Sequence, residues 1–138
     1  MAQQSIENFL AQNVEPVETN KEVHFKRFKD PFIIRALTSK EMDNVRKAAT
    51  RKVRNRAGVM TAETDQDKFS DGLIVAALVS PDPNNAQLQE SWDTVADPAG
   101  TIKNMLLAGE YVELGQQVQT LSGFDADEFD NVRDEVKN

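Results

Sequence analysis

The stretch Pro31-Phe-Ile-Ile-Arg-Ala-Leu-Thr-Ser-Lys-Glu41 contains the point at which the chain changes from a strand pattern to a helix pattern. The part up to Leu37 is rich in β-forming residues. The part from Thr38 to Glu41 is a capping box, in which the Thr hydroxyl accepts from a free backbone N–H and the Glu carboxylate reaches back. The sequence therefore predicts that a strand ends and a long helix begins here.

Upstream of this stretch, residues 22–28 alternate apolar and polar side chains, and Lys29-Asp30-Pro31 is typical of a turn. We therefore expect an N-terminal β-hairpin. Residues 1–20 are polar, with one short amphipathic segment around Phe9, and we interpret them as an N-terminal arm. Residues 21–138 are expected to form a single globular domain.

Downstream of Thr38 the apolar residues recur at helical spacing. The first helix is predicted to end before Gly58, with Met42, Val45, Ala49 and Val53 on its apolar face. Further helices are predicted over residues 65–80, 84–93, 98–107 and 110–121, and a last one from Asp125 onward. The predicted fold class is α+β, with an N-terminal β-hairpin followed by a bundle of about five helices.

The composition argues against an enzyme. The 138 residues include no cysteine and one histidine, so a thiol nucleophile, a cysteine zinc site and any site needing two imidazoles are excluded. None of the six glycines lies in a phosphate-binding loop pattern. We predict no catalytic residue, no metal site and no cofactor. The longest apolar run is too short to span a membrane, and the N-terminus does not resemble a secretory signal. We therefore expect no membrane partner and a cytoplasmic location.

Charge is distributed unevenly along the chain. Residues 21–56 carry twelve Lys and Arg against four acids, whereas residues 57–138 carry four against sixteen. The net charge of -7 argues against nucleic-acid binding. On the predicted first helix, one face collects the candidate partner-binding residues Lys47, Arg51, Arg54 and Arg56. This stripe would suit an acidic partner, although a solvated helix face is the simpler interpretation.

A second candidate partner-binding surface is the amphipathic N-terminal segment. It contains Ile6, Phe9 and Leu10, whose side chains could lie in a groove of a partner helix. The simpler interpretation is a frayed terminus or a short helix that packs on its own chain.

Segments along almost the whole chain have a familiar order. They are Arg27-Phe-Lys-Asp30, Phe32-Ile-Ile-Arg-Ala-Leu-Thr-Ser-Lys-Glu41, Ala76-Ala-Leu-Val-Ser-Pro-Asp-Pro83, Leu106-Leu-Ala-Gly-Glu-Tyr111, Leu121-Ser-Gly-Phe124 and Asp134-Glu-Val-Lys-Asn138. In this order and spacing the chain resembles the XkdN-like tail assembly chaperones of phages and phage-like elements. The resemblance runs from about Ser5 to Asn138.

The resemblance implies a small non-enzymatic chaperone that holds the tape measure protein soluble while tail tube subunits polymerise around it. The tail tube protein is a second candidate partner, and self-association is left open. Such a protein would act in the host cytoplasm and be absent from the mature virion. Two alternatives remain open: a structural tail or head–tail joining protein retained in the virion, and a nucleic-acid-binding regulator.

Overall fold

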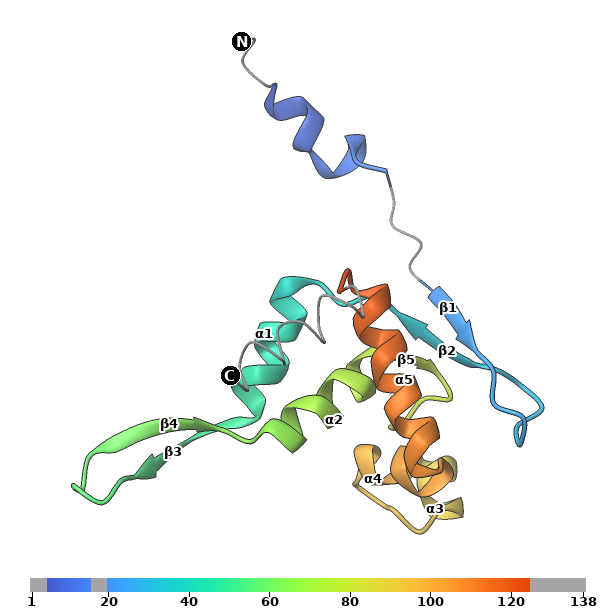
Figure 1. The fold of residues 1–138 in the computed structure, drawn as a ribbon. Coiled ribbons are helices and arrows are strands. Elements are labelled where there is room, and N and C mark those ends of the chain that lie inside the picture. The colour runs from blue at the N-terminus through green and yellow to red at the C-terminus, as the bar shows by residue number, and fades with distance from the viewer. Residues whose placement is uncertain (1–4, 16–19, 125–138) are drawn as a thin grey trace.

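The structure is a computed structural model, and it describes residues 5–15 and 20–124. Two small antiparallel sheets are interspersed with helices along the chain (Figure 1). In chain order, the elements are η1 (Ile6–Phe9), η2 (Ala11–Asn13), β1 (Asn20–Val23), β2 (Phe32–Arg35), α1 (Ser39–Ala48), β3 (Thr50–Arg54), β4 (Met60–Thr64), α2 (Gln66–Ala77), β5 (Leu78–Ser80), α3 (Ala86–Ser91), α4 (Pro98–Met105) and α5 (Ala108–Leu121).

The first sheet has the strand order β1-β2-β5, so its third strand comes from the middle of the chain. β1 pairs antiparallel with β2, with Val23 opposite Phe32. On the other side of β2, Ile34 is opposite Leu78. The sequence predicts residues 78–80 as the end of a helix, and this prediction is wrong. Because every second residue of β2 is buried, pairing its second edge satisfies backbone groups that would otherwise be left without partners.

The second sheet is the hairpin β3–β4, which projects from the rest of the molecule (Figure 1). The predicted first helix therefore ends at Ala48 rather than near Gly58. Thr50 contributes to this stop, because its hydroxyl donates to the carbonyl of Arg46 over 2.7 Å and lies 2.7 Å from the Thr64 hydroxyl across the hairpin. Thr is β-branched, and β-branched residues favour strands over helices, so pairing with Thr64 favours the strand at this position.

The fold prediction of an N-terminal hairpin followed by a helical bundle is wrong, because strands are spread through the chain. Several local signals are nevertheless confirmed. The Thr38–Glu41 capping box is present, and α2 and α4 begin at or next to their predicted positions, where Asp65 and Asp97 cap them. The helix predicted from Asp125 lies outside the described residues.

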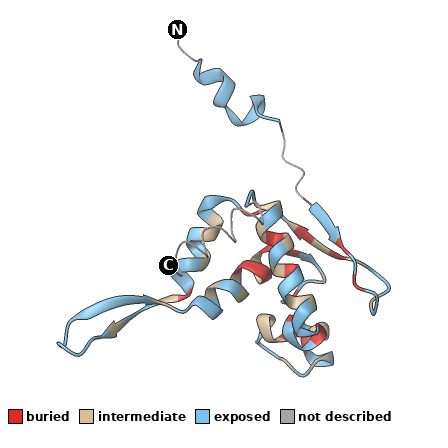
Figure 2. Ribbon diagram, viewed as in Figure 1, coloured by how far each residue is buried: buried red, intermediate tan, exposed pale blue. Residues whose placement is uncertain are grey.

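The core lies between the first sheet and helices α2, α4 and α5 (Figure 2). It contains side chains that are at most 2% exposed from β2, α4 and α5, namely Phe32, Ile34, Ile102, Leu114 and Val118. The ring of Phe32 makes edge-on contacts with two other aromatic rings, at centroid distances of 5.3 Å and 5.1 Å. Trp92 and Tyr111 are partly buried against this core.

Candidate partner-binding surfaces

The four basic residues predicted to share one helix face do not share a helix. Lys47 lies in the last turn of α1, Arg51 and Arg54 lie in β3, and Arg56 lies in the turn that follows. Side chains alternate between the two faces of a strand, so Arg51 and Arg54 point to opposite faces of the hairpin. The aligned stripe is therefore absent. The basic residues lie instead along the projecting hairpin of residues 50–64, which we call the basic arm.

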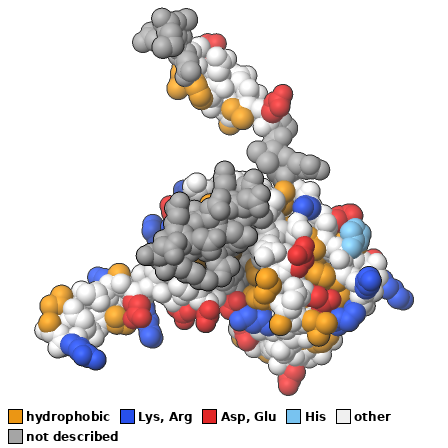
Figure 3. All heavy atoms as spheres, viewed as in Figure 1, with side chains coloured by type: hydrophobic (Ala, Val, Ile, Leu, Met, Phe, Trp, Pro, Cys, Tyr) orange, Lys and Arg blue, Asp and Glu red, His pale blue; other side chains and the backbone are white. Residues whose placement is uncertain are grey.

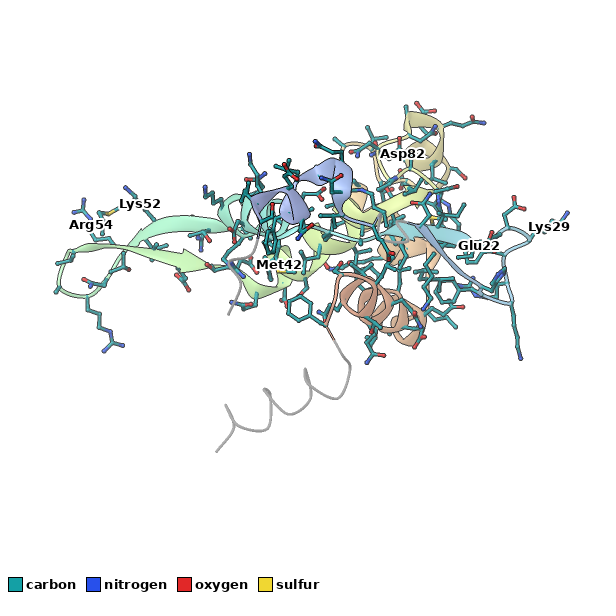
Figure 4. The ribbon with its side chains drawn as sticks, turned by 90° about the horizontal axis from the view of Figure 1, so that it is seen from above. Glu22, Lys29, Met42, Lys52, Arg54 and Asp82 are labelled. Carbon is teal, nitrogen blue, oxygen red and sulfur yellow. The ribbon has the colours of Figure 1, made fainter. Side chains whose placement is uncertain are left out.

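The hairpin register places the charges on each face of this arm. Arg51 is opposite Glu63, Lys52 is opposite Ala62, and Arg54 is opposite Met60. Residues 50–64 contain four basic side chains and one acidic side chain. Figure 4 shows Lys52 and Arg54 on this arm, well away from Glu22 of the first sheet. The arm is thus a basic extension of a protein whose net charge is -7.

The turn of the hairpin is organised by one asparagine and one glycine. The side chain of Asn55 accepts hydrogen bonds from the N–H groups of Ala57 and Val59, at 2.9 Å and 3.0 Å. Gly58 has a φ of +78°, in the left-handed region that glycine adopts without steric cost. Val59 and Met60 are 57% and 51% exposed, so the arm ends in an apolar patch that is visible beside basic side chains in Figure 3.

Sequence reasoning missed this arm, although the sequence contains a signal for it. Two short runs with β-branched residues, 50–54 and 60–64, flank a segment that holds Asn55 and Gly58. The helical spacing of Val45, Ala49 and Val53 concealed this signal.

The N-terminal segment exposes apolar side chains. Ser5 caps η1 by accepting from the N–H of Glu7 over 3.3 Å. Ile6 is 73% exposed, Phe9 is 62% exposed and Leu10 is 39% exposed. In Figure 1 this segment lies apart from the sheets and helices. The structure therefore brings the three predicted residues together on one short segment and leaves them unburied.

A groove of about 500 Å³ lies among α1, α2 and α4. Its lining includes small or apolar side chains from all three helices, namely Val45, Ala48, Ala49, Gly72, Val75, Pro98 and Ala99. Aspartates also contribute to the lining, namely Asp65, Asp67, Asp71 and Asp97. Two of them, Asp65 and Asp97, are helix N-caps, and their carboxylates accept hydrogen bonds from backbone N–H groups. The lining of this groove is thus largely apolar, and its charged residues are these aspartates and Lys68.

A polar cluster joins α2, α4 and α5 beside this groove. The hydroxyl of Tyr111 donates to Asp71 over 2.7 Å, and the ammonium of Lys103 lies 2.7 Å from the other oxygen of the same carboxylate. Burial of the phenol and its hydrogen bond to Asp71 raise the pKa of Tyr111 above its ordinary value. The phenol therefore stays protonated at neutral pH. Every polar group of the cluster has a partner, so it acts as a clamp between helices.

Another polar contact connects the first strands to the helices. The guanidinium of Arg27 donates to Glu110 over 2.6 Å and to the carbonyl of Met105 over 2.8 Å. The hydrogen bond from Arg27 lowers the pKa of Glu110, and the Leu107 N–H, which also donates to that carboxylate, lowers it further. This ion pair, with Arg27 exposed and Glu110 half-buried, holds the start of α5 against the loop that precedes β2.

Two further observations concern the described residues only. Among residues 5–15 and 20–124, no group of three His, Asp or Glu side chains is arranged to hold a metal ion. No helix in that part of the chain is both long enough and apolar enough to span a membrane.

Comparison with solved structures supports the fold. The crystal structure of the protein YqbN superposes with a TM-score of 0.69, covering 90% of this chain and 100% of that chain at 24% sequence identity. At this level of identity the similarity concerns the fold alone.

Comparison with curated sequences gives related proteins of similar extent. The phage-like element PBSX protein XkdN of Bacillus subtilis (strain 168) is 29% identical over 122 residues, covering 82% of this chain and 80% of the relative. The uncharacterised protein YqbN of the same organism is 30% identical over 122 residues, with 82% and 79% covered. The family model of the phage XkdN-like tail assembly chaperone protein matches residues 6–137. The chain therefore belongs to the phage XkdN-like tail assembly chaperone family.

Proposed function

We propose that this protein binds the tape measure protein of its phage or prophage and keeps it soluble while the tail tube assembles. The observation that carries this proposal is the family match over residues 6–137. A long protein whose apolar helical segments are transiently exposed aggregates unless they are covered. A small acidic protein that binds them reversibly would also add repulsive charge to the complex.

The proposal includes a location and a fate. The protein acts in the host cytoplasm, without catalysis, and leaves before the virion is complete. The tail tube protein is a second candidate partner, because tube subunits would replace the chaperone along the tape measure.

We place the main contact on the N-terminal segment. Its apolar side chains Ile6 and Phe9 are largely exposed in the free protein. Burying one such side chain against a partner is worth about 1.5–3 kcal/mol, before the cost of ordering the segment. An apolar helical segment of a tape measure offers a matching surface.

The basic arm supplies a second, weaker contact in this proposal. Arg51, Arg54 and Arg56 are exposed, and an acidic segment of the partner would meet them in a salt-dependent way. Because these side chains do not form one aligned stripe, we expect them to influence the association rate more than the final affinity.

Co-expression with the cognate tape measure protein tests the proposal. The measured quantity is the fraction of tape measure protein in the soluble fraction, with and without this protein. We expect a clear increase, with the two proteins co-purifying. No change in tape measure solubility would contradict the chaperone assignment.

A matched pair of variants tests the contact. Ile6→Ser with Phe9→Ser should lower co-purification by about 10-fold or more, the equivalent of about 1.4 kcal/mol. The control is Val95→Ser with Val112→Ser, two side chains of the folded part that are 68% and 58% exposed. An equal loss for both double variants would reject the N-terminal segment as the contact.

Mass spectrometry of purified particles tests the fate. A chaperone should be absent or far below one copy per tail subunit. A stoichiometric amount in the finished tail would instead support a structural tail or head–tail joining protein.

A further inference from the structure

The projecting hairpin has an edge that no described strand occupies. The second sheet contains only β3 and β4 among residues 20–124. The N–H of Asn55 donates to the carbonyl of Val59, and the N–H of Asp65 donates to the carbonyl of Ala49, both at 2.9 Å. Asn55 and Val59, and Ala49 and Asp65, are therefore hydrogen-bonded pairs. In an antiparallel ladder such pairs alternate with pairs whose backbone N–H and C=O groups point away from the partner strand. Outward backbone groups on β4 therefore belong to Met60, Ala62 and Thr64.

The two edges of the hairpin differ in charge. On β3 the outward residues include Lys52 and Arg54, and charged side chains, lysine above all, protect an edge from pairing with another chain. The whole of β4 carries a single charged side chain, Glu63. The β4 edge is thus an uncovered edge without this protection.

We propose that β4 pairs antiparallel with β4 of a second copy of this chain, about a two-fold axis at Ala62. The two hairpins then form one four-stranded sheet. In this register Ala62 is opposite its own copy, Met60 is opposite Thr64, and Thr61 is opposite Glu63. Every outward backbone group of β4 finds a partner, and no two like charges face each other directly.

Charge complementarity favours this arrangement. Pairing through β3 would place Lys52 opposite Lys52 of the second copy, and like charges directly opposite are destabilising. Pairing through β4 directs the basic tip of each hairpin, with Arg56, toward the start of α2 in the other copy, which carries Asp65 and Asp67. The basic arm thus meets an acidic region of the same protein. A closed two-fold dimer is also the commonest symmetric assembly.

Single cysteines test the register directly, since the chain has no native cysteine. Directly opposed residues in a hydrogen-bonded antiparallel pair have Cα atoms about 5.5 Å apart, within the range that a disulfide spans. Ala62→Cys should therefore form a dimer under mild oxidation. The matched control Lys52→Cys is on the outer strand, where the two copies of the residue are three strand spacings, about 14 Å, apart. It should form no disulfide-linked dimer.

Proline variants test the association without a covalent bond. The N–H of Ala62 points outward and takes no part in the hairpin, so Ala62→Pro removes a donor from the free edge alone. Sedimentation equilibrium of the wild-type chain should show a concentration-dependent rise from 15.4 kDa toward twice that mass. Ala62→Pro should raise the dimer dissociation constant about 10-fold or more, whereas Lys52→Pro, on the opposite edge, should change it less than about 3-fold.

Three results would overturn the proposal. The first is a wild-type chain that stays monomeric at every concentration up to the millimolar range. The second is equal oxidation of the Ala62→Cys and Lys52→Cys variants to dimers. The third is a monomeric chain whose Ala62→Pro variant loses a co-expressed tail protein, which would assign the edge to a strand of that protein. None of these measurements depends on tape measure solubility, so the chaperone proposal stands or fails separately.

Discussion

The folded body and the projecting hairpin are held together by different interactions. In the body, β2, α2, α4 and α5 share a core whose central side chains are almost fully buried. In the hairpin, most side chains of β3 and β4 are exposed, as Figure 2 shows. An isolated two-stranded hairpin is only marginally stable in water. The body is therefore stabilised by burial, and the hairpin by its turn and backbone ladder.

This difference matters for function, because a segment that contributes little to the core can bind a partner without loss of the folded body. The hairpin and the N-terminal segment together hold many of the exposed large apolar side chains, including Phe9 and Met60. Loss of either contact surface should leave the body folded. The predictions below test this separation, from the largest expected effect to the smallest.

Truncation of a core side chain should have the largest effect. Leu73 is 6% exposed on α2, and Leu73→Ala should lower the free energy of unfolding by about 2–5 kcal/mol, because it leaves a cavity. Met60→Ala on the hairpin should cost less than about 0.5 kcal/mol. Urea unfolding followed by circular dichroism measures both. Equal costs would show that the hairpin is part of the cooperative core.

The two regions should also respond differently to an added methyl group. A Cβ on Gly72 would lie 2.7 Å from a γ-carbon of Val45, where α1 crosses α2, so Gly72→Ala should cost about 1–2 kcal/mol through crowding. A Cβ on Gly58 meets nothing within 4 Å, and Gly58→Ala should cost about 1 kcal/mol through backbone strain alone. The control is the double variant Gly72→Ala with Val45→Ala. Failure of Val45→Ala to relieve the cost would contradict the crowding explanation.

The smallest expected effect is a pH dependence at the start of α1. Glu41 accepts from Arg35 at 2.5 Å and from the N–H of Thr38 at 3.1 Å, and these hydrogen bonds lower its pKa to about 2 in the folded protein. A lowered pKa stabilises the folded state above the ordinary value of 4.5. That contribution is lost as the pH falls from about 4.5 toward 2.

Glu41→Gln should therefore be less stable than the wild type at pH 7 by less than about 1 kcal/mol, since both side chains of the ion pair are about one-third exposed. The difference between the two proteins should shrink as the pH falls below 4.5. Thermal melts at several pH values measure it. A difference that is independent of pH would assign the effect to the cap geometry rather than to charge.

Helix starts could be predicted because their signals are local. The Thr38–Glu41 box, the Asp65 cap and the Asp97-Pro98 pair satisfy backbone N–H groups within a few residues, and each of these helices begins there. Helix ends were less predictable. Residues 50–54 and 78–80 were predicted to continue helices, but they form strands because other segments of the chain offer backbone partners.

The candidate surfaces were also predicted where the signal is local and mispredicted where it depends on the fold. The exposure of Ile6 and Phe9 agrees with an amphipathic segment that finds no core of its own among the described residues. The basic residues 47–56 were identified as a group, but their arrangement depended on whether residue 50 continues a helix or starts a strand. That choice changed an aligned stripe into an arm with basic side chains on both faces.

The sequence by itself determined where helices begin, which residues are apolar enough for the core, and the overall charge asymmetry, because each depends on short-range chemistry or composition. Only the tertiary structure decided that β5 joins β2 and that α1 gives way to the hairpin. The first choice depends on pairing between residues far apart in the chain, Ile34 and Leu78, and the second depends on the pairing of β3 with β4 across a short turn. A periodic pattern of apolar residues indicates which side chains can be buried, but it does not indicate which strand pairs with the segment that carries them.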